Sequence, residues 1–272
     1  MPDHPDPSPS VRQAARVSPQ TLGWLLGVVG VMIFALSIPM TRLASGSLDA
    51  PQLPAVFVAI GRAALAGLLA AVWLLVTRAP RPRPAQWRGL LLSALGVVFG
   101  WPLFLGFAFW KGGAALQAAD GLLVVAILFS SFGYVHGAGL STPQGDGSAP
   151  MPAEQVISWL LVASLPITLP VALATWPTGP VRLQAWGGFV YVSVFSMWLG
   201  FFAWYRGLAL GGMMRVSQVQ LLQPFLSMWL AVPLLGESVD AATLGFSLAV
   251  MATVFLSRRM AVSAPAAPLA KA

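Results

Sequence analysis

The sequence contains no cysteine, which excludes disulfide frameworks, thiolate metal sites and cysteine nucleophiles. Charge is scarce as well: 8% of the 272 residues are charged, against about 25% in a typical soluble domain. So few charges cannot cover a water-facing surface, and a soluble enzyme is therefore excluded. Intrinsic disorder is excluded too, because 57% of the residues are hydrophobic and the mean hydropathy is +0.79.

The few charges are separated by long apolar stretches. Crossing the hydrocarbon core of a bilayer takes about 20 mostly apolar residues, with a range of about 17–25. Seven uncharged stretches fit one span each, and an eighth candidate, 54–76, is interrupted only by Arg62. The seven are 17–41, 89–110, 121–145, 155–181, 183–205, 216–236 and 241–257. They lack the alternating pattern of a lipid-facing barrel, so the sequence predicts an all-α integral membrane bundle of about eight transmembrane helices.

Lysine and arginine are distributed unevenly over the connecting segments, which sets the orientation of a membrane protein. With both termini in the cytoplasm, eleven cations lie inside, one (Arg62) lies within a span, and three lie outside: Arg42, Lys111 and Arg182. This predicts a multi-pass protein of the inner (plasma) membrane. The formal charge of +7 is then a topology signal and an attraction to anionic lipid headgroups of the bilayer, and we expect no nucleic-acid partner.

A family resemblance is found near the end of the chain, over 205–237 and the apolar run 241–258. The segment has an Ala-Leu pair at a helix end, a basic loop, a helix interrupted by proline, and a Gly-Glu pair before the last helix. The matching positions are Ala209-Leu210, Arg215, Pro224 and Gly236-Glu237. This pattern resembles the end of an EamA-type repeat of the drug/metabolite transporter superfamily, and 61–75 (GRAALAGLLAAVWLL) resembles the second span of that family.

The resemblance implies two five-helix repeats related to a ten-span inverted-repeat fold. Here only three spans precede 111–121, so the fourth and fifth spans of the first half are expected to be missing. The expected organisation is a disordered cytoplasmic tail over 1–20, a shortened first repeat of three spans over 21–120, a second repeat of five spans over 121–259, and a cytoplasmic tail over 260–272. Small and polar faces would then turn toward lipid or a second copy, so we expect a homodimer or reduced stability.

The two halves also share a short sequence pattern. Val98-Phe99 and Val194-Phe195 each begin a Gly- and aromatic-rich segment in the third span of its half. Small residues four apart, at Gly23/Gly27, Gly133/Gly137 and Gly207/Gly211, predict that helices approach one another closely.

The resemblance implies a secondary transporter that exports small metabolites (amino acids or related compounds, or drugs) by alternating access. The alternative is a transport-incompetent membrane scaffold or partner protein. We expect no enzyme activity, because the spans contain no carboxylate pair and the two histidines, His4 and His136, are far apart. No phosphate-binding loop surrounds Lys111, and no metal or cofactor is expected.

Polar residues within spans are the candidate substrate-binding groups. Arg62 either binds an anionic group or reaches the interface or helix-end carbonyls. Gln220, Gln223 and Ser227 share a helix face beside Pro224, which we expect to free the carbonyl of Gln220. These side chains either face a wet cavity or hold neighbouring helices together.

Further candidates lie in the fourth and neighbouring spans. Ser130 and Tyr134 share a helix face, and Trp101 and Trp198 are deep enough to line a substrate cavity. Trp204 and Tyr205, beside Arg206, are expected instead to be interface anchors.

The topology predicts which engineered cysteines a membrane-impermeant thiol reagent reaches from outside the cell. Because the chain has no native cysteine, Gly113→Cys should be labelled and Ser263→Cys spared. Labelling of intact cells and of permeabilised cells measures this, and the reverse pattern would contradict the orientation.

Overall fold

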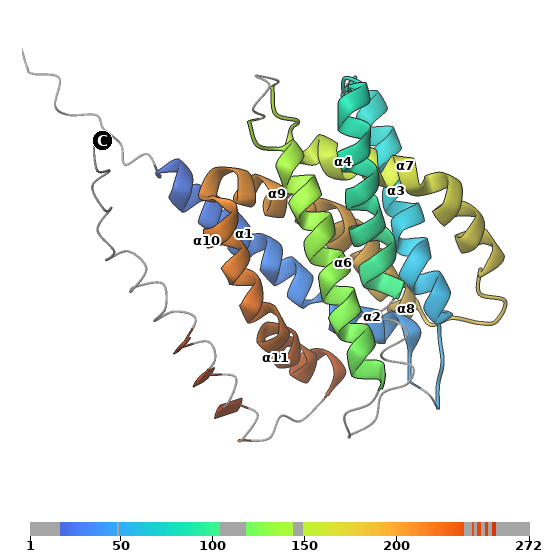
Figure 1. Ribbon diagram of the computed structural model, residues 1–272. Helices are drawn as coiled ribbons and strands as arrows, with labels where there is room; N and C mark the ends of the chain where they lie inside the picture. The colour runs from blue at the N-terminus through green and yellow to red at the C-terminus, as the bar shows by residue number, and fades with distance from the viewer. Residues whose placement is uncertain are drawn as a thin grey trace, which may run out of the picture.

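The computed structural model describes residues 17–47, 49–103, 118–143 and 149–236, with scattered positions between 241 and 253. Every regular element in these ranges is a helix, and several helices follow one another with only a change of helical type (Figure 1). In chain order they are α1 (Pro19–Ala35), α2 (Ser37–Ser45), η1 (Phe57–Gly61), α3 (Arg62–Val76), α4 (Pro84–Ala94), η2 (Leu95–Gly100), α6 (Ala118–Leu140), α7 (Ala153–Ala174), α8 (Leu183–Val190), η3 (Tyr191–Leu199), α9 (Gly200–Gly211), α10 (Met213–Ser217), η4 (Gln218–Leu222) and α11 (Gln223–Leu235).

Five helical stretches among the described residues are long and apolar enough to cross a bilayer. They are Pro19–Ser45, Phe57–Val76, Ala153–Ala174, Leu183–Gly211 and Met213–Leu235, and a shorter apolar helix covers Val124–Leu140. Large apolar side chains such as Leu75, Leu128 and Leu173 are mostly exposed, which suits lipid rather than water. The expected all-helical membrane protein is confirmed. The number of eight spans stays a prediction, because much of 104–117 and 237–260 lies outside the described residues.

Three of the helices contain π-helical turns, η1, η2 and η3, which are wider than an α-helix. Two of these turns contain the residue pairs of the expected internal repeat: Val98-Phe99 lies in η2 and Val194-Phe195 in η3. The two segments therefore share a backbone irregularity as well as similar residues. Such turns are frequent at functional sites.

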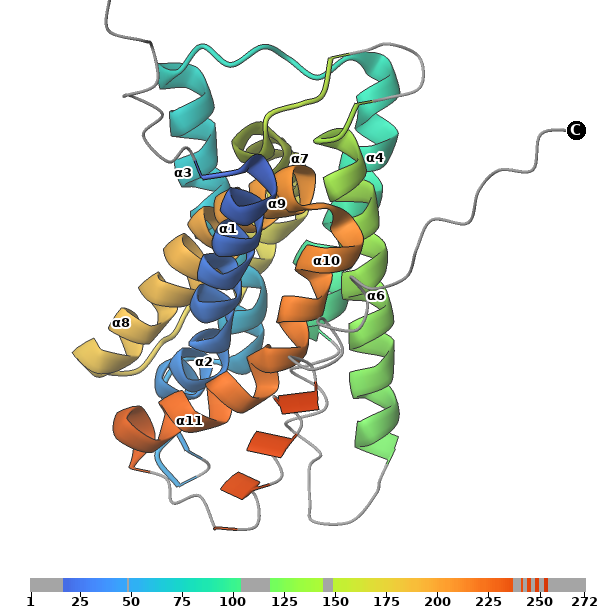
Figure 2. The same cartoon turned by 90° about the vertical axis from the view of Figure 1, so that its left-hand side faces the viewer.

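A very close helix crossing joins α1 and α9 (Figure 2). A Cβ atom at Gly207 would lie 2.8 Å from the amide nitrogen of Gly27, and one at Gly23 would overlap the backbone of Gly211. Only glycine fits at these positions, because a side chain would meet backbone atoms that cannot rotate away. The prediction that these glycines permit close helix approach is confirmed.

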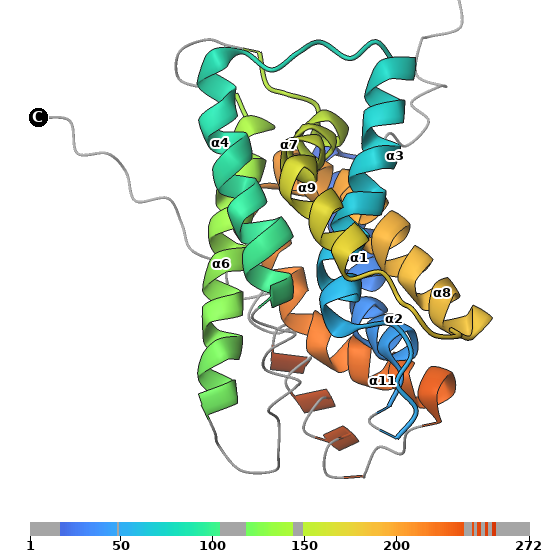
Figure 3. The same cartoon turned by 90° about the vertical axis from the view of Figure 1, so that its right-hand side faces the viewer.

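A second crossing of the same kind joins α4 and η2 to α6. A Cβ atom at Gly96 would lie 2.7 Å from the Cα of Gly133. In addition, α3 packs against α7 (Figure 3). Before the 104–117 segment the three spans are α1–α2, η1–α3 and α4–η2, and after it the first three are α6, α7 and α8–α9. The first span of each set contacts the third span of the other set, and the two second spans contact each other. Two halves related by a two-fold axis would exchange contacts in this way, and the organisation into two repeats stays a prediction.

Trp204 and Tyr205 are buried in the bundle core, so the prediction that they are interface anchors was wrong. Both side chains are 0% exposed. A Cβ atom at Gly30 would lie 3.3 Å from the Cα of Trp204, and the Tyr205 hydroxyl lies 3.2 Å from Oγ of Ser93. The adjacent Arg206 is exposed, but the close approach of α9 to α1 turns the two preceding rings inward.

The crossing predicts opposite effects of alanine at two helical glycines. Gly23→Ala should lower the free energy of unfolding by about 1–3 kcal/mol, because its methyl group would collide with the α9 backbone. Gly187→Ala in α8, where nothing lies within 4 Å of the added Cβ, should raise it by about 0.5–1 kcal/mol. Equilibrium unfolding of the purified variants in detergent measures both, and similar effects of the two substitutions would contradict the crossing.

Candidate functional site

A cavity of about 850 Å³ lies inside the bundle, within the range of about 300–1,000 Å³ usual for small-molecule sites. The segment after α2, from Gly46 to Ala55, forms one end of its wall. Phe34, Arg62, Tyr134 and Gln223 lie among its deeper lining. The other lining residues are Ser37, Ile38, Thr41, Arg42, Ser45, Val58, Ala59, Val97, Trp101, Pro102, Ser196, Met197 and Phe201. The lining is mostly apolar with a few polar groups, as sites for small organic molecules usually are.

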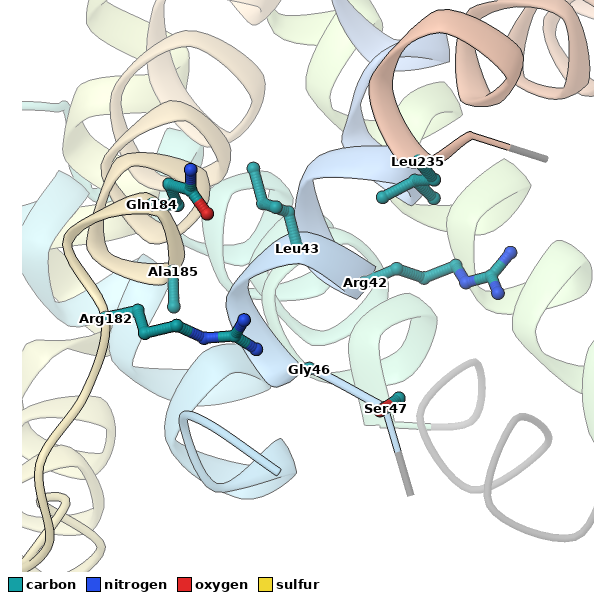
Figure 4. Close-up of a pocket in the computed structure, with 8 residues that line it drawn as sticks. All are labelled: Arg42, Leu43, Gly46, Ser47, Arg182, Gln184, Ala185 and Leu235. Carbon is teal, nitrogen blue, oxygen red and sulfur yellow. The ribbon is translucent and has the colours of Figure 1, made fainter. Parts of the chain in front are cut away.

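A smaller pocket of about 270 Å³ adjoins the cavity and shares Arg42, Gly46 and Ser47 with it. Figure 4 shows the Arg182 side chain extending from the start of α8 toward α2, and the Arg42 side chain extending from α2 away from Arg182. The Arg182 amide donates a hydrogen bond of 2.9 Å to Oε1 of Gln52, which ties this end of α8 to the segment after α2. We call this end of the cavity, beside the smaller pocket, its mouth. Two cationic side chains, Arg42 and Arg182, line the smaller pocket there.

The first span is broken where the cavity reaches it. Helix α1 ends at Ala35 and α2 starts at Ser37, because Pro39 has no N–H to donate to the carbonyl four residues earlier, that of Ala35. The hydroxyl of Ser227 on α11 donates to this carbonyl instead, at 2.7 Å. The side-chain amide of Gln223 donates to the neighbouring Phe34 carbonyl at 3.5 Å.

The seventh expected span is interrupted in a different way from the one the sequence suggested. Residues 218–222 form a 3₁₀ helix, and the backbone N–H of Gln223 donates to the backbone carbonyl of Gln220. Pro224 then lies in the first turn of α11, where a missing N–H costs nothing. The expectation that Pro224 frees the Gln220 carbonyl was therefore wrong, and the carbonyl without an intrahelical donor is on α1.

Side chains from three helices form a polar line beside the cavity. Nε2 of Gln220 donates to the hydroxyl of Tyr134 at 3.4 Å and to Oε1 of Gln223 at 3.5 Å. Tyr134 and Gln223 line the cavity, and Gln220 supports both of them. These long, weak hydrogen bonds can be exchanged for bonds to a bound molecule at little cost.

Arg62 is the first residue of α3, directly after the π turn η1, and it lines the cavity. Its side chain is 8% exposed, and its Nε is buried without a hydrogen-bond partner. Within the described residues it neither reaches the surface nor bonds to helix-end carbonyls. Binding of an anionic group by Arg62 stays a prediction.

Of the other candidates, Trp101 lines the cavity but Trp198, Ser130 and Ser227 do not. Nε1 of Trp198 donates to Oγ of Ser158 on α7 at 2.9 Å. The Ser130 hydroxyl donates to the carbonyl of Ile127 in its own helix, at 2.9 Å.

Sequence reasoning missed Ser37 and Ser196, whose hydroxyl oxygens lie 2.6 Å apart at the cavity wall. The available signal was Pro39, a proline within an apolar run and close to a serine. Among the described residues, no group of three or more His, Asp or Glu side chains could hold a metal ion.

Comparison with known proteins gives three results. Residues 117–259 match the EamA-like transporter family. The chain is 34% identical to "Uncharacterized transporter YdeK" of Bacillus subtilis (strain 168) over 294 aligned positions, which cover 89% of this chain and 98% of that protein. A solved structure described only as "Crystal structure of protein" aligns over 89% of this chain and 88% of its own, at 19% identity and a TM-score of 0.39, too low to support an argument.

The contact between α11 and the broken first span predicts an energetic coupling between Ser227 and Pro39. Ser227→Ala should cost about 1–3 kcal/mol of unfolding free energy, because it leaves the Ala35 carbonyl without a donor. In a Pro39→Ala background the new backbone N–H can reach that carbonyl, so the same substitution should cost less. A double-mutant cycle by equilibrium unfolding measures the coupling. Equal costs in the two backgrounds would mean that Pro39 does not create the acceptor.

Proposed function

Because this chain belongs to the EamA-like transporter family, we propose that it is a secondary transporter that exports small metabolites across the plasma membrane by alternating access. The observation that carries the proposal is the cavity of about 850 Å³ at the broken first span. Interrupted membrane helices expose backbone and polar side chains at a protein-lined cavity, and transporters bind their substrates at such interruptions.

The helix packing supports the proposal, because the helices are in close contact at one end of the bundle and the cavity lies toward the other end. Near the α9–α10 connection, the glycine contacts bring the backbones of α1 and α9 together, and Trp204 and Tyr205 fill the adjacent space. The cavity lies toward the opposite end, beside the 46–55 segment. Alternating access would require the glycine crossings to separate while the cavity mouth closes.

The distribution of arginine supports the proposed orientation. Six described arginines lie in or near the connections from α3 to α4 and from α9 to α10: Arg78, Arg81, Arg83, Arg88, Arg206 and Arg215. Figure 2 shows these connections at one end of the bundle, opposite the end of α11. By the positive-inside rule the crowded end is cytoplasmic, and the cavity mouth, with Arg42 and Arg182, faces outward.

Each proposed binding residue has a distinct role. Tyr134 and Gln223 would exchange hydrogen bonds with the substrate, and Gln220 would hold them in place. Trp101 would supply a flat apolar wall. The resemblance suggests amino acids, related compounds or drugs as substrates, moved passively or with an ion gradient.

The length of the alignment agrees with the proposal that the chain lacks two spans of the first repeat. The 89% of this chain that aligns is about 242 residues, against 294 aligned positions, which leaves about 50 positions without a residue of this chain. Two spans of about 20 residues with their connections have this length. The family match over 117–259 supports a complete second repeat. The faces that the absent spans would cover are left for lipid or for a second copy of the chain.

Export should depend on the polar line beside the cavity. Replacing Gln220 and Gln223 together with leucine removes the amide groups that reach Tyr134 and the Phe34 carbonyl, so export should fall to the level of cells without the protein. Mass spectrometry of metabolites released by expressing cells measures this. The matched control is Gln218→Leu, an exposed glutamine of the same 3₁₀ segment, which should export normally.

Unchanged export by the double variant would show that the two glutamines only hold helices together. If the wild-type chain leaves the released metabolites unchanged across a broad panel, the scaffold alternative is correct.

A further inference from the structure

Arg62 is a buried cation without a counter-charge in the described part of the chain. Its side chain is 8% exposed, and no carboxylate lies among the described residues that line the cavity. Of the two carboxylates whose side chains are described, Asp49 is exposed in the segment after α2 and Glu154 lies in the first turn of α7. A guanidinium group within a membrane bundle normally pairs with an acidic side chain or with backbone carbonyls.

Arg62 also lacks the contacts that would make it a structural residue. Its Nε is buried without a hydrogen-bond partner, and no hydrogen bond or ion pair joins its side chain to the described residues. The carbonyls of Ile33, Phe34 and Ala35 at the break in the first span accept from Tyr191, Gln223 and Ser227 respectively. The five N–H donors of the guanidinium are therefore available to a molecule in the cavity.

The surroundings of Arg62 determine which anion fits. Apolar and aromatic side chains, among them Phe34, Trp101 and Phe201, line the same cavity, together with the hydrogen-bonding groups of Tyr134 and Gln223. One guanidinium can neutralise one carboxylate with two parallel hydrogen bonds, and the aromatic walls suit an apolar body. Arg62 by itself neutralises a monoanion and leaves a doubly charged phosphate half neutralised.

Two further arginines lie at the end of the cavity beside the segment after α2. Arg42 lines both the cavity and the adjoining pocket, and Arg182 lines the pocket (Figure 4). The positive charge of the exposed Arg182 favours the approach of an anionic ligand to this pocket.

Resting on the proposed function, we infer that the substrates are small amphiphilic monocarboxylates, with the carboxylate held by Arg62 and an aromatic or branched apolar body packed against Trp101 and Phe201. Because no described carboxylate lines the cavity to receive an ammonium group, a carboxylate without an amino group binds better than the corresponding amino acid. The pairing also supplies the counter-charge that Arg62 otherwise lacks.

Binding of ligands that share one body and differ only in charge tests the inference directly. For the wild-type protein in detergent, titration calorimetry with 3-phenylpropionate, phenylalanine, 3-phenylpropionamide and 3-phenylpropylamine gives the four affinities, and an indolyl series and a branched aliphatic series repeat the test. The carboxylate should bind at least ten-fold more tightly than the amide and the amine, with the amino acid in between. A preference for the amine or the amide, or no carboxylate binding in any series, overturns the inference.

Variants then assign the preference to Arg62. Arg62→Gln should weaken carboxylate binding at least ten-fold and leave amide binding unchanged. Arg62→Lys should retain part of the preference for the carboxylate, because lysine keeps the positive charge but cannot form the bidentate pair of hydrogen bonds. Arg206→Gln, an exposed arginine near the opposite end of the bundle, is the matched control and should bind like the wild type. Equal carboxylate affinity of Arg62→Gln and wild type overturns the inference. If neither Arg62 variant folds, the wild-type ligand series decides alone.

Transport in proteoliposomes separates this inference from the proposed function. Carboxylate binding that depends on Arg62 without any transport would contradict the transporter proposal and leave the site assignment standing. Export of a neutral or cationic compound that Arg62→Gln does not affect would leave the transporter proposal standing and remove the assignment.

Discussion

Direct backbone contact between helices, made possible by glycine, is the constraint on which the rest of the bundle depends. In lipid there is little hydrophobic drive for one apolar helix to pack on another, so close contact has to provide the attraction through dispersion forces. Gly23, Gly27, Gly207 and Gly211 provide it between α1 and α9, and Gly96 with Gly133 provide it between η2 and α6. Where these helices continue past the glycines, they leave room for the cavity.

The cavity is built from interruptions in the helices as well as from their separation. Pro39 breaks the first span, a 3₁₀ segment breaks the seventh, and π turns lie in three other helices. Each interruption leaves polar backbone atoms that lipid cannot satisfy, so they must face protein or a polar cavity. Tyr191, Gln223 and Ser227 donate to carbonyls of the first span, and the contacts of Gln223 and Ser227 hold α11 beside the cavity wall.

Because charged residues are few, the position of each arginine is informative. Most described arginines lie near the ends of the helices, where water can hydrate them. Arg62 differs, because it follows the π turn η1 and lines the cavity among aromatic and aliphatic side chains. Burial of that charge is costly unless an anion or polar groups balance it.

The sequence alone determined the properties that depend on local pattern. Long uncharged stretches indicated membrane helices, glycines four residues apart indicated close packing, and the 205–237 segment indicated the family. Arg62, Trp101, Tyr134 and Gln223 could be selected because a polar or large aromatic side chain inside an apolar span is unusual wherever it occurs.

Only the tertiary structure decided which groups meet. Ser227 satisfies the Ala35 carbonyl from 192 residues away, Trp198 turns to Ser158, and Tyr205 is buried on Ser93 although Arg206 beside it is exposed. The position of a side chain along its helix follows from sequence spacing, but the partner of a buried polar atom depends on how helices far apart in the chain cross. The glycine spacing indicates that a helix is approached closely, but which helix approaches it is decided only in the assembled bundle.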